Sequence, residues 1–376
     1  MFFEAQKKDY QICNFCIMDT SDPEIHFNEV GRCNHCADKD PLDPEISRAR
    51  YQTLGDQLKD LVYKIKKDGK KKPFDCIIGI SGGVDSSYVA WLVKDLGLRP
   101  LAVHLDNGWN AELAVQNIHT TLSKLGIDLI TRVLDWEEFK DLQVSFLKAS
   151  TPDAEIPTDH AIFALNYEIA HKYKLKYFIS GSNRQTESIM PRMWSQGHND
   201  WTYIKSVHKK FGTKKLNNYP HYSWAKMQWY RNISGIKWIN ILEFVDYKKL
   251  DVIEILKKDL EWVPYSSKHG ESIYTKFFQE YILPIKFGAD KRRAHLSNLI
   301  TNQEISRGEA LKKFEMEKAT ESEIKSDFFF VIKKLGLSES EFEKIMQSPI
   351  KTIHDYHNST FDPFYKKLEH KLTTLL

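Results

Sequence analysis

Short apolar runs alternate with amphipathic segments through the middle of this 376-residue chain. The apolar runs predict buried strands at 76–80, 100–105, 128–134 and 176–180, with a fifth strand near 239–244. Between these runs, the spacing of apolar residues predicts a helix that stops at Gly97 and further helices at 112–125, 136–150 and 159–173. Because strands that alternate with helices are joined by crossover connections, we expect an α/β fold with a parallel, five-stranded, doubly wound sheet.

The chain divides into units of different composition. Residues 1–40 form a small cysteine-containing module, 41–73 a helical linker, 74–245 the α/β domain, and 246–376 a helical C-terminal region that we expect to contribute to the substrate site. The segment 185–235 is rich in Trp, Tyr, Lys and Asn, and we interpret it as an insertion that covers the site or shapes a substrate pocket. Its composition would also suit nucleic acid, but the modest net charge of +3 makes such a partner a less favoured interpretation.

The amino-acid composition indicates a globular protein. A hydrophobic content of 41% and a charged content of 28% are typical of a globular protein with a packed core. Apolar runs stay shorter than a membrane span, and the N-terminal residues lack the apolar centre of a signal peptide. We therefore expect a cytoplasmic protein with no membrane partner.

The most specific chemistry lies in the turn between the first strand and the first helix of the α/β unit. Residues 81–87 read SGGVDSS, and two adjacent glycines let the main chain approach a phosphate closely. The start of the following helix favours negative charge, and Asp85 can bind a phosphate-bound Mg²⁺. No lysine follows the glycines, so this is not a Walker loop. The residues expected to bind a nucleotide here are Ser81, Gly82, Gly83, Asp85, Ser86 and Ser87, with Asp85 and Ser86 also candidates for catalysis. A glycine turn that binds no nucleotide is the alternative interpretation.

Polar residues follow two other strands, and the carboxyl ends of parallel strands meet at one edge of the sheet. His104 and Asp106 end the second strand, where they can border a nucleotide, and Asp106 can help to hold Mg²⁺. Gly181 and Ser182 follow the fourth strand, and Glu187 is close enough in sequence to bind Mg²⁺ or to position a nucleophile. A simple Asp-Asn-Gly turn and a helical ion pair of Glu187 are the ordinary alternatives.

Three further groups have two interpretations each. Thr158 or Asp159 is expected to be the N-cap of the helix that follows, although Asp159 could equally point into the cleft. Lys268 and His269 are candidate catalytic residues, with His269 as the general acid or base. The basic run at 290–293 suits an anionic substrate group or departing pyrophosphate, but such runs are often solvated surface.

Four of the five cysteines form two closely spaced pairs near the N-terminus: Cys13 with Cys16, and Cys33 with Cys36. Each pair can hold one metal ion from a tight turn, so the spacing predicts a closed, structural Zn²⁺ site. Two disulfides are the alternative, which a reducing cytosol disfavours. The fifth cysteine, Cys76, lies in a predicted buried strand.

Together with the cysteine pairs, the segments 81–87, 104–109 and 181–187 and the run 262–307 resemble the N-acetyl sugar amidotransferase family. That family belongs to the PP-loop ATP-pyrophosphatases, whose fold is of the adenine nucleotide alpha hydrolase type. It serves bacterial surface-glycan synthesis, in O-antigens and in flagellin-type nonulosonic acids.

The resemblance implies a substrate, cofactors and a partner. ATP with Mg²⁺ would adenylate an N-acetyl oxygen of a sugar, free or nucleotide-activated, and ammonia would displace AMP to leave an acetamidino group. Ammonia would come from a separate glutaminase subunit, because this chain has no Cys at position 2 and Cys76 lies in a predicted buried strand.

Two other functions remain open. PP-loop tRNA thiolases can also have N-terminal cysteine pairs, but they usually need further reactive cysteines, and this sequence has none after Cys76. A zinc-bearing nucleotide-binding scaffold without catalysis is the third possibility. The presence of Asp85 and the loop serines counts against that possibility.

Overall fold

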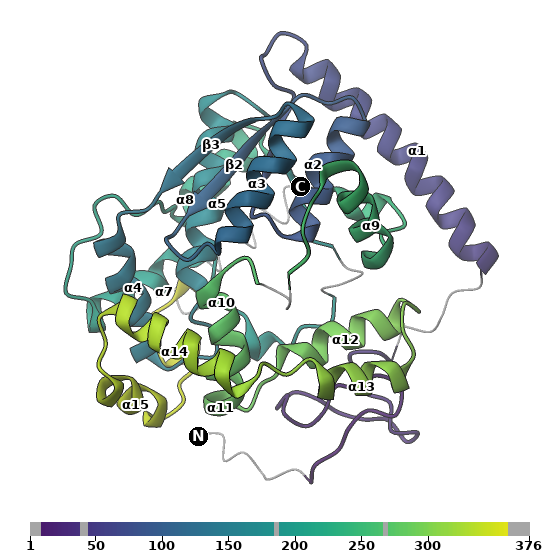
Figure 1. Cartoon of the computed structure of the whole chain (residues 1–376). Coiled ribbons are helices and arrows are strands. Elements are labelled where there is room, and N and C mark those ends of the chain that lie inside the picture. Colours follow the sequence, from purple (N-terminus) through teal and green to yellow (C-terminus); the bar gives the residue numbers. More distant parts are fainter. Residues whose placement is uncertain (1–8, 38–43, 184–187, 266–269, 360–376) are drawn as a thin grey trace.

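The computed structural model describes residues 9–37, 44–183, 188–265 and 270–359. Five parallel strands form one sheet in the order β3-β2-β1-β4-β5, which lies in the upper part of Figure 1. The strands are β1 (Cys76–Gly79), β2 (Pro100–Asp106), β3 (Asp128–Val133), β4 (Tyr177–Ser180) and β5 (Lys237–Asn240). This arrangement confirms the predicted α/β sheet. The fifth strand ends earlier than predicted, because a short 3₁₀ helix, η3 (Ile241–Phe244), takes up the rest of that segment.

Successive residues of the central strands face opposite sides of the sheet. Ile78 packs into a buried cluster with helices α1 (Pro44–Gly69), α2 (Val84–Asp95), α3 (Glu112–Leu125) and α9 (Lys249–Leu260). Ile77 packs on the other side, where α5 (Ile156–Lys172) covers the sheet. Because both faces are buried, these strands are continuous apolar runs and do not alternate between apolar and polar residues.

The segment predicted as a helical linker is the 26-residue helix α1. Its second half is packed into the core of the α/β unit through Leu58, Val62 and Ile65. The helix therefore helps to cover one face of the sheet, in addition to connecting the cysteine module to β1.

The N-cap prediction for Thr158 or Asp159 is wrong. Helix α5 begins at Ile156, with Glu155 in the N-cap position and Pro157 in the first turn. Proline is favoured there because its fixed φ suits a helix and its missing N–H would have had no helical partner. Thr158 instead accepts a hydrogen bond from Asn107 Nδ2 at 3.2 Å.

The aromatic-rich segment folds against the side of the sheet domain. Its described residues, 188–235, include η1 (Arg192–Trp194), α7 (Trp201–Phe211), α8 (Trp224–Gln228) and η2 (Trp229–Ile233), and α7 packs beside α4 (Trp136–Ala149). Tyr203, Tyr219 and Tyr222 are buried, and two of them stack with His160 of α5. Much of the aromatic content is therefore core.

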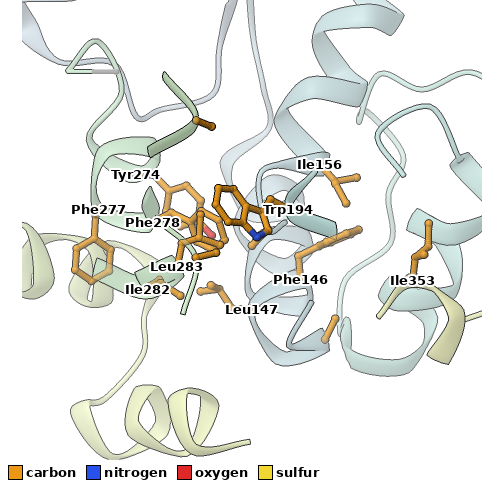
Figure 2. Close-up of a cluster of buried hydrophobic side chains, with 14 of the residues drawn as sticks. Phe146, Leu147, Ile156, Trp194, Tyr274, Phe277, Phe278, Ile282, Leu283 and Ile353 are labelled. Carbon is orange, nitrogen blue, oxygen red and sulfur yellow. The ribbon is translucent and has the colours of Figure 1, made fainter. Parts of the chain in front are cut away.

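The C-terminal region is helical, as predicted. Its elements are α10 (Ile273–Phe277), η4 (Phe278–Ile282), α11 (Leu283–Phe287), α12 (Lys291–Thr301), α13 (Arg307–Met316), α14 (Glu321–Leu335), α15 (Glu339–Gln347) and η5 (Ile353–Asp355). Figure 2 shows how this region shares a core with the rest of the chain: Tyr274 and Phe278 lie close to Phe146 of α4 and to Trp194. Within the described ranges, no helix combines the length and the hydrophobicity that a membrane span requires.

Candidate active site

The loop between β1 and α2 is held by its own serines. Ser86 Oγ donates to the carbonyl of Gly83 at 3.1 Å and lies 3.2 Å from the backbone nitrogen of Ser81, from which it accepts a hydrogen bond. Gly83 in turn donates its N–H to Ser81 Oγ at 3.3 Å. Among the described residues, no side chain caps the first turn of α2. The N–H groups at the start of this helix are therefore suited to bind an anion.

Gly82 is required by both conformation and space. Its φ is +83°, and a Cβ at this position would lie 2.6 Å from the carbonyl oxygen of Ala114 in α3. The Gly82 carbonyl accepts hydrogen bonds from Trp262 Nε1 at 2.9 Å and from the Tyr265 hydroxyl at 3.0 Å. Burial raises the pKa of Tyr265 to about 12, so its hydroxyl remains a donor at neutral pH. Two aromatic residues that are distant in sequence thus hold the turn in place.

Asp85 is held by a buried tyrosine. Tyr247, which is 2% exposed, donates its hydroxyl hydrogen bond to Asp85 Oδ1. Burial and, after it, the neighbouring Asp85 charge raise the pKa of Tyr247, which keeps the phenol protonated. Gly181 packs on the same residue: a Cβ on Gly181 would lie 3.3 Å from the backbone carbonyl of Asp85. The end of β4 therefore reaches the loop, as expected from the shared edge of the sheet.

A cavity of about 530 Å³ lies between this loop and the C-terminal region. The loop contributes Ser81, Gly83, Val84, Asp85 and Ser86 to its lining. The opposite wall includes Glu271, Lys276, Gln279, Lys291, Arg292, His295, Lys318 and Glu323. Lys249, Ile253, Trp262, Pro264 and Tyr265 also line it. One cavity thus exposes the loop and several C-terminal helices to the same ligand, whereas none of the residues described between 188 and 235 lines it.

The cations of the far wall are held by partners. Lys291 Nζ lies 3.8 Å from Glu155 Oε2, and both side chains are nearly buried. Arg292 donates to the carbonyl of Glu317 at 2.9 Å, and Lys276 pairs with Asp327 at 2.8 Å. The basic run at 290–293 is therefore not a uniformly solvated surface. Its Lys291 and Arg292 line the cavity with positions set by these contacts.

His104 and Asp106 contribute to the turn after β2. His104 Nδ1 donates to the carbonyl of Ile80 at 2.8 Å, and Nε2 lies 3.0 Å from Asn110 Nδ2, which can only donate. Burial lowers the pKa of His104, which favours this neutral tautomer. Asp106 Oδ1 accepts the N–H of Gly108 at 2.8 Å. Neither residue lines the cavity described above, and Asp106 builds the Asp-Asn-Gly turn expected as its ordinary alternative.

The turn after β2 is tied to the C-terminal region. The N–H of Ala111 donates to the carbonyl of Glu271 at 3.0 Å, and the N–H of Ile273 donates to the carbonyl of Trp109 at 2.9 Å. Lys334 of α14 also donates to a carbonyl in this turn and lies 4.9 Å from the centre of the Trp109 ring. The C-terminal region therefore contacts two of the three strand ends that the sequence singled out: this turn and, through Trp262 and Tyr265, the loop after β1.

The remaining predicted residues are placed as follows. Ser87 is fully buried, and among the described residues its hydroxyl has no hydrogen-bond partner, so a side-chain contact with a nucleotide is not supported. Ser182 lies just after β4 and donates its N–H to Ser180 Oγ at 3.1 Å. Glu187, Lys268 and His269 lie outside the described residues.

Several residues of the site were missed from the sequence. Trp262 and Tyr265 stand in the run that supported the family resemblance, but their spacing indicates no contact with Gly82. Tyr247 gave no signal, because one tyrosine between charged residues is typical of a surface position. His295 had no motif of its own.

The four N-terminal cysteines form one buried cluster. Sγ–Sγ distances are 3.6 Å for Cys13–Cys36, 3.5 Å for Cys16–Cys33 and 3.6 Å for Cys33–Cys36. A disulfide requires about 2.05 Å, whereas four thiolates about 2.3 Å from one tetrahedral ion lie about 3.8 Å apart. All four thiol ligand atoms lie within 4.8 Å of one another, so this cluster could bind zinc. Backbone N–H groups donate to its sulfurs, including that of Cys33 to Cys13 Sγ at 3.3 Å, which favours thiolates.

Comparison with known proteins identifies a related C-terminal domain. Residues 271–370 match the family described as LPS biosynthesis protein WbpG-like, C-terminal domain, in agreement with the resemblance inferred from the sequence. The chain is also 27% identical over 213 residues to tRNA-specific 2-thiouridylase MnmA 2 of Fusobacterium nucleatum, a match that covers 55% of this chain and 57% of that protein. The chain thus spans little more than half the length of this curated relative.

Solved structures with some similarity include two synthetases. NMN synthetase from Francisella tularensis aligns with a TM-score of 0.35 at 18% identity, over 74% of this chain and 98% of that chain. The NH₃-dependent NAD synthetase from Campylobacter jejuni aligns with a TM-score of 0.29 at 14% identity, over 56% of this chain and 93% of that chain.

Proposed function

We propose that this chain is an ATP-dependent amidotransferase that converts an N-acetyl group of a sugar into an acetamidino group. The acetamido oxygen attacks the α-phosphorus of ATP, forming an O-adenylate and releasing pyrophosphate. Ammonia then adds to the activated carbon, a proton is lost, and the C–O bond to AMP breaks. In sum, the amide, ATP and ammonia give the amidine, AMP and pyrophosphate. The amide oxygen leaves as part of AMP, and NH takes its place. We place this reaction in bacterial surface-glycan synthesis and in the cytoplasm, where ATP is available.

The observation that carries this proposal is the shared cavity. Its near wall is the glycine-serine loop with Asp85, and its far wall comes from helices that match the WbpG-like domain. An ATP-splitting reaction needs its nucleotide and its acceptor in one space, so that the reacting atoms can meet. The hydroxyl donors and cations of the lining suit a phosphate chain. Its aromatic side chains suit a polar sugar.

Each part of the site has a role in this reaction. The uncapped first turn of α2 and the hydroxyls of Ser81 and Ser86 would bind phosphate oxygens, and Asp85 would hold Mg²⁺. The cation would neutralise charge on the pyrophosphate that leaves. Lys291 and Arg292, held in place across the cavity, would contact the acceptor or the departing pyrophosphate.

We also propose that a separate glutaminase supplies the ammonia. Cys76 is the one cysteine of this sequence outside the N-terminal four-cysteine cluster, and it is fully buried in β1. Burial raises the pKa of its thiol, so it is poorly suited to serve as the nucleophile of glutamine hydrolysis. In the absence of a partner, free ammonium should therefore support the reaction and glutamine should not.

The test is a pyrophosphate-release assay with ATP, Mg²⁺, ammonium and a panel of di-acetamido sugars. One sugar should stimulate release, and mass spectrometry should show a product in which NH replaces O. Asp85→Ala should abolish release and retain the bound metal, because the two sites are separate. Pyrophosphate release that no acetamido sugar stimulates would contradict the proposal.

A second candidate is tRNA thiolation, favoured by the similarity to the 2-thiouridylase. Such an enzyme would also adenylate a carbonyl oxygen, but sulfur would be the nucleophile. The same assay distinguishes the two, with tRNA and a sulfide donor in place of sugar and ammonium. Formation of thiouridine in tRNA, detected by mass spectrometry after nuclease digestion, would indicate that the substrate is tRNA and not a sugar.

A further inference from the structure

The cysteine module is bound to helix α12 through buried polar contacts. Arg293 Nε pairs with Asp19 Oδ2 at 2.9 Å, and the two side chains are 13% and 3% exposed. Arg293 also donates to the carbonyl of Ile17 at 3.0 Å, and the N–H of Ile17 donates to the fully buried Ser297 Oγ at 3.1 Å. The segment that directly follows Cys16 is therefore fixed to α12 by the ion pair of Asp19 and by hydrogen bonds of the N–H and the carbonyl of Ile17.

Helix α13 makes a second connection, to the candidate metal-binding turn itself. Arg307 donates to the carbonyl of Cys13 at 2.9 Å and to the carbonyl of Cys16 at 3.0 Å. These carbonyls belong to two of the four candidate ligands, so their positions depend on how the turn is folded. Figure 1 shows the module lying along α12 and α13.

Helix α12 also forms part of the cavity. Lys291, Arg292 and His295 line the cavity, while Arg293 and Ser297 of the same 11-residue helix contact the module. One short helix therefore has the candidate metal centre on one side and the cavity on the other. A helix with its side chains is only about 10 Å across, so a shift of the module moves the cavity wall directly.

Metal binding is expected to stabilise the shape of this module. A unit of this size buries too little apolar surface to fold alone, and a four-cysteine site supplies the missing folding energy when the ion binds. Without the ion, nothing bonds the four sulfurs to one another, and the backbone turns that carry them are less restricted. The partners of Arg293 and Arg307 then lose their fixed positions.

We propose that the metal centre is a structural support of the cavity, and that Arg293, Ser297 and Arg307 are positioning residues that transmit metal occupancy to the α12 wall. The location of the coupling follows from the contacts above. Its effect on an acceptor rests on the proposed function, in which the α12 wall contacts the sugar. Loss of zinc, by chelation or by thiol oxidation, would therefore impair acceptor binding without altering the glycine-serine loop.

The first test is hydrogen exchange of the zinc-loaded and chelator-treated protein, with zinc content measured alongside. Amides of 291–301 should exchange at least about tenfold faster after metal removal, while those of β1 and β2 keep their protection. Unchanged exchange at 291–301 in protein shown to lack zinc would overturn the proposal. This measurement uses no substrate, so it stands or falls independently of the proposed reaction.

The second test keeps the metal and breaks the connection. Arg293→Gln should retain zinc, increase exchange at 291–301, and raise KM for the acceptor sugar about tenfold, with kcat and the KM for ATP nearly unchanged. Arg293→Lys should restore part of this KM, and Lys313→Gln, on the exposed side of α13, should resemble the parent. Equal losses in both KM values would indicate general destabilisation and contradict the positioning role. If chelation also increases hydrogen exchange in β1 and β2, the test depends on exchange at 291–301 in the zinc-bound Arg293→Gln protein. Unchanged exchange there would overturn the proposal.

Discussion

Tyr247 donates its hydroxyl hydrogen bond to Oδ1 of Asp85, across 162 positions of sequence. The tyrosine comes from the segment between η3 and α9 and is buried, whereas Asp85 lines the cavity. A buried donor on one carboxylate oxygen restricts the orientation of the whole group. The aspartate expected to bind Mg²⁺ is thereby held in one position before any ligand arrives.

Tyr247→Phe should lower kcat for pyrophosphate release about 10- to 100-fold, because a hydrogen bond to a charged group contributes about 1.5–3 kcal/mol. The ring and its packing remain, so the melting temperature and the zinc content should change little. Tyr177→Phe is the matched control, since it removes the hydroxyl of another buried tyrosine, which donates to Asp68 and not to the loop. Equal losses of activity in the two variants would contradict a specific role for Tyr247.

Gly82→Ala should destabilise the protein by more than the strain of a positive φ alone. Its φ of +83° disfavours any side chain, and the new Cβ would also meet the Ala114 carbonyl at 2.6 Å. Gly126→Ala is the control, because Gly126 has a φ of +60° and nothing within 4 Å of the added Cβ. Backbone strain of this kind costs about 1–3 kcal/mol. In urea unfolding, Gly82→Ala should lose more free energy of unfolding than Gly126→Ala, and calorimetry should show weakened ATP binding for Gly82→Ala only.

The fold was predictable because its signals are local. Both faces of the sheet are buried, so each central strand is an apolar run, and each crossover helix shows its own spacing. The packing partners of the aromatic-rich segment were not predictable, because composition does not indicate what a side chain packs against. Tyr203, Tyr219 and Tyr222 contribute to the aromatic content of this segment, and they pack into the core.

The site was predictable only in part. Glycines, hydroxyls and a carboxylate within seven residues identify the loop, since phosphate binding needs them close together in sequence. The groups that hold this loop come from far along the chain: Trp262 lies 180 positions after Gly82, and Tyr247 lies 162 positions after Asp85. A contact across such a distance leaves no periodic pattern in one sequence. It becomes visible only when the chain is folded.

Cys76→Ala should leave the amidotransferase reaction intact. The thiol is fully buried at the start of β1, and its pKa is raised by burial, so it is a core side chain. Removing a small buried group should lower the free energy of unfolding by about 1–2 kcal/mol, measured by urea denaturation. Loss of all activity in a folded Cys76→Ala protein would indicate that this sulfur takes part in the chemistry, as in a thiolase.

His160 should make the protein less stable below neutral pH. The ring is fully buried and stacks on Tyr222 with centroids 4.4 Å apart. Its Nδ1 donates to the carbonyl of His198 at 2.8 Å, and its Nε2 accepts the N–H of Tyr222 at 3.3 Å, so both nitrogens are engaged in the neutral form. Burial is the main cause that lowers the pKa of His160 from 6.5 to about 4.

Protonation of His160 should therefore be coupled to unfolding. Between about pH 6.5 and about pH 4 the unfolded chain binds a proton that the folded chain excludes, so this contribution to stability is complete above pH 6.5 and is lost as the pH falls through that window. The shift corresponds to about 3 kcal/mol over the whole range. Urea midpoints measured across the window should show this slope in the parent protein. His160→Gln, which keeps a donor and an acceptor but does not titrate, should show a shallower slope, and an unchanged slope would assign the acid sensitivity to other groups.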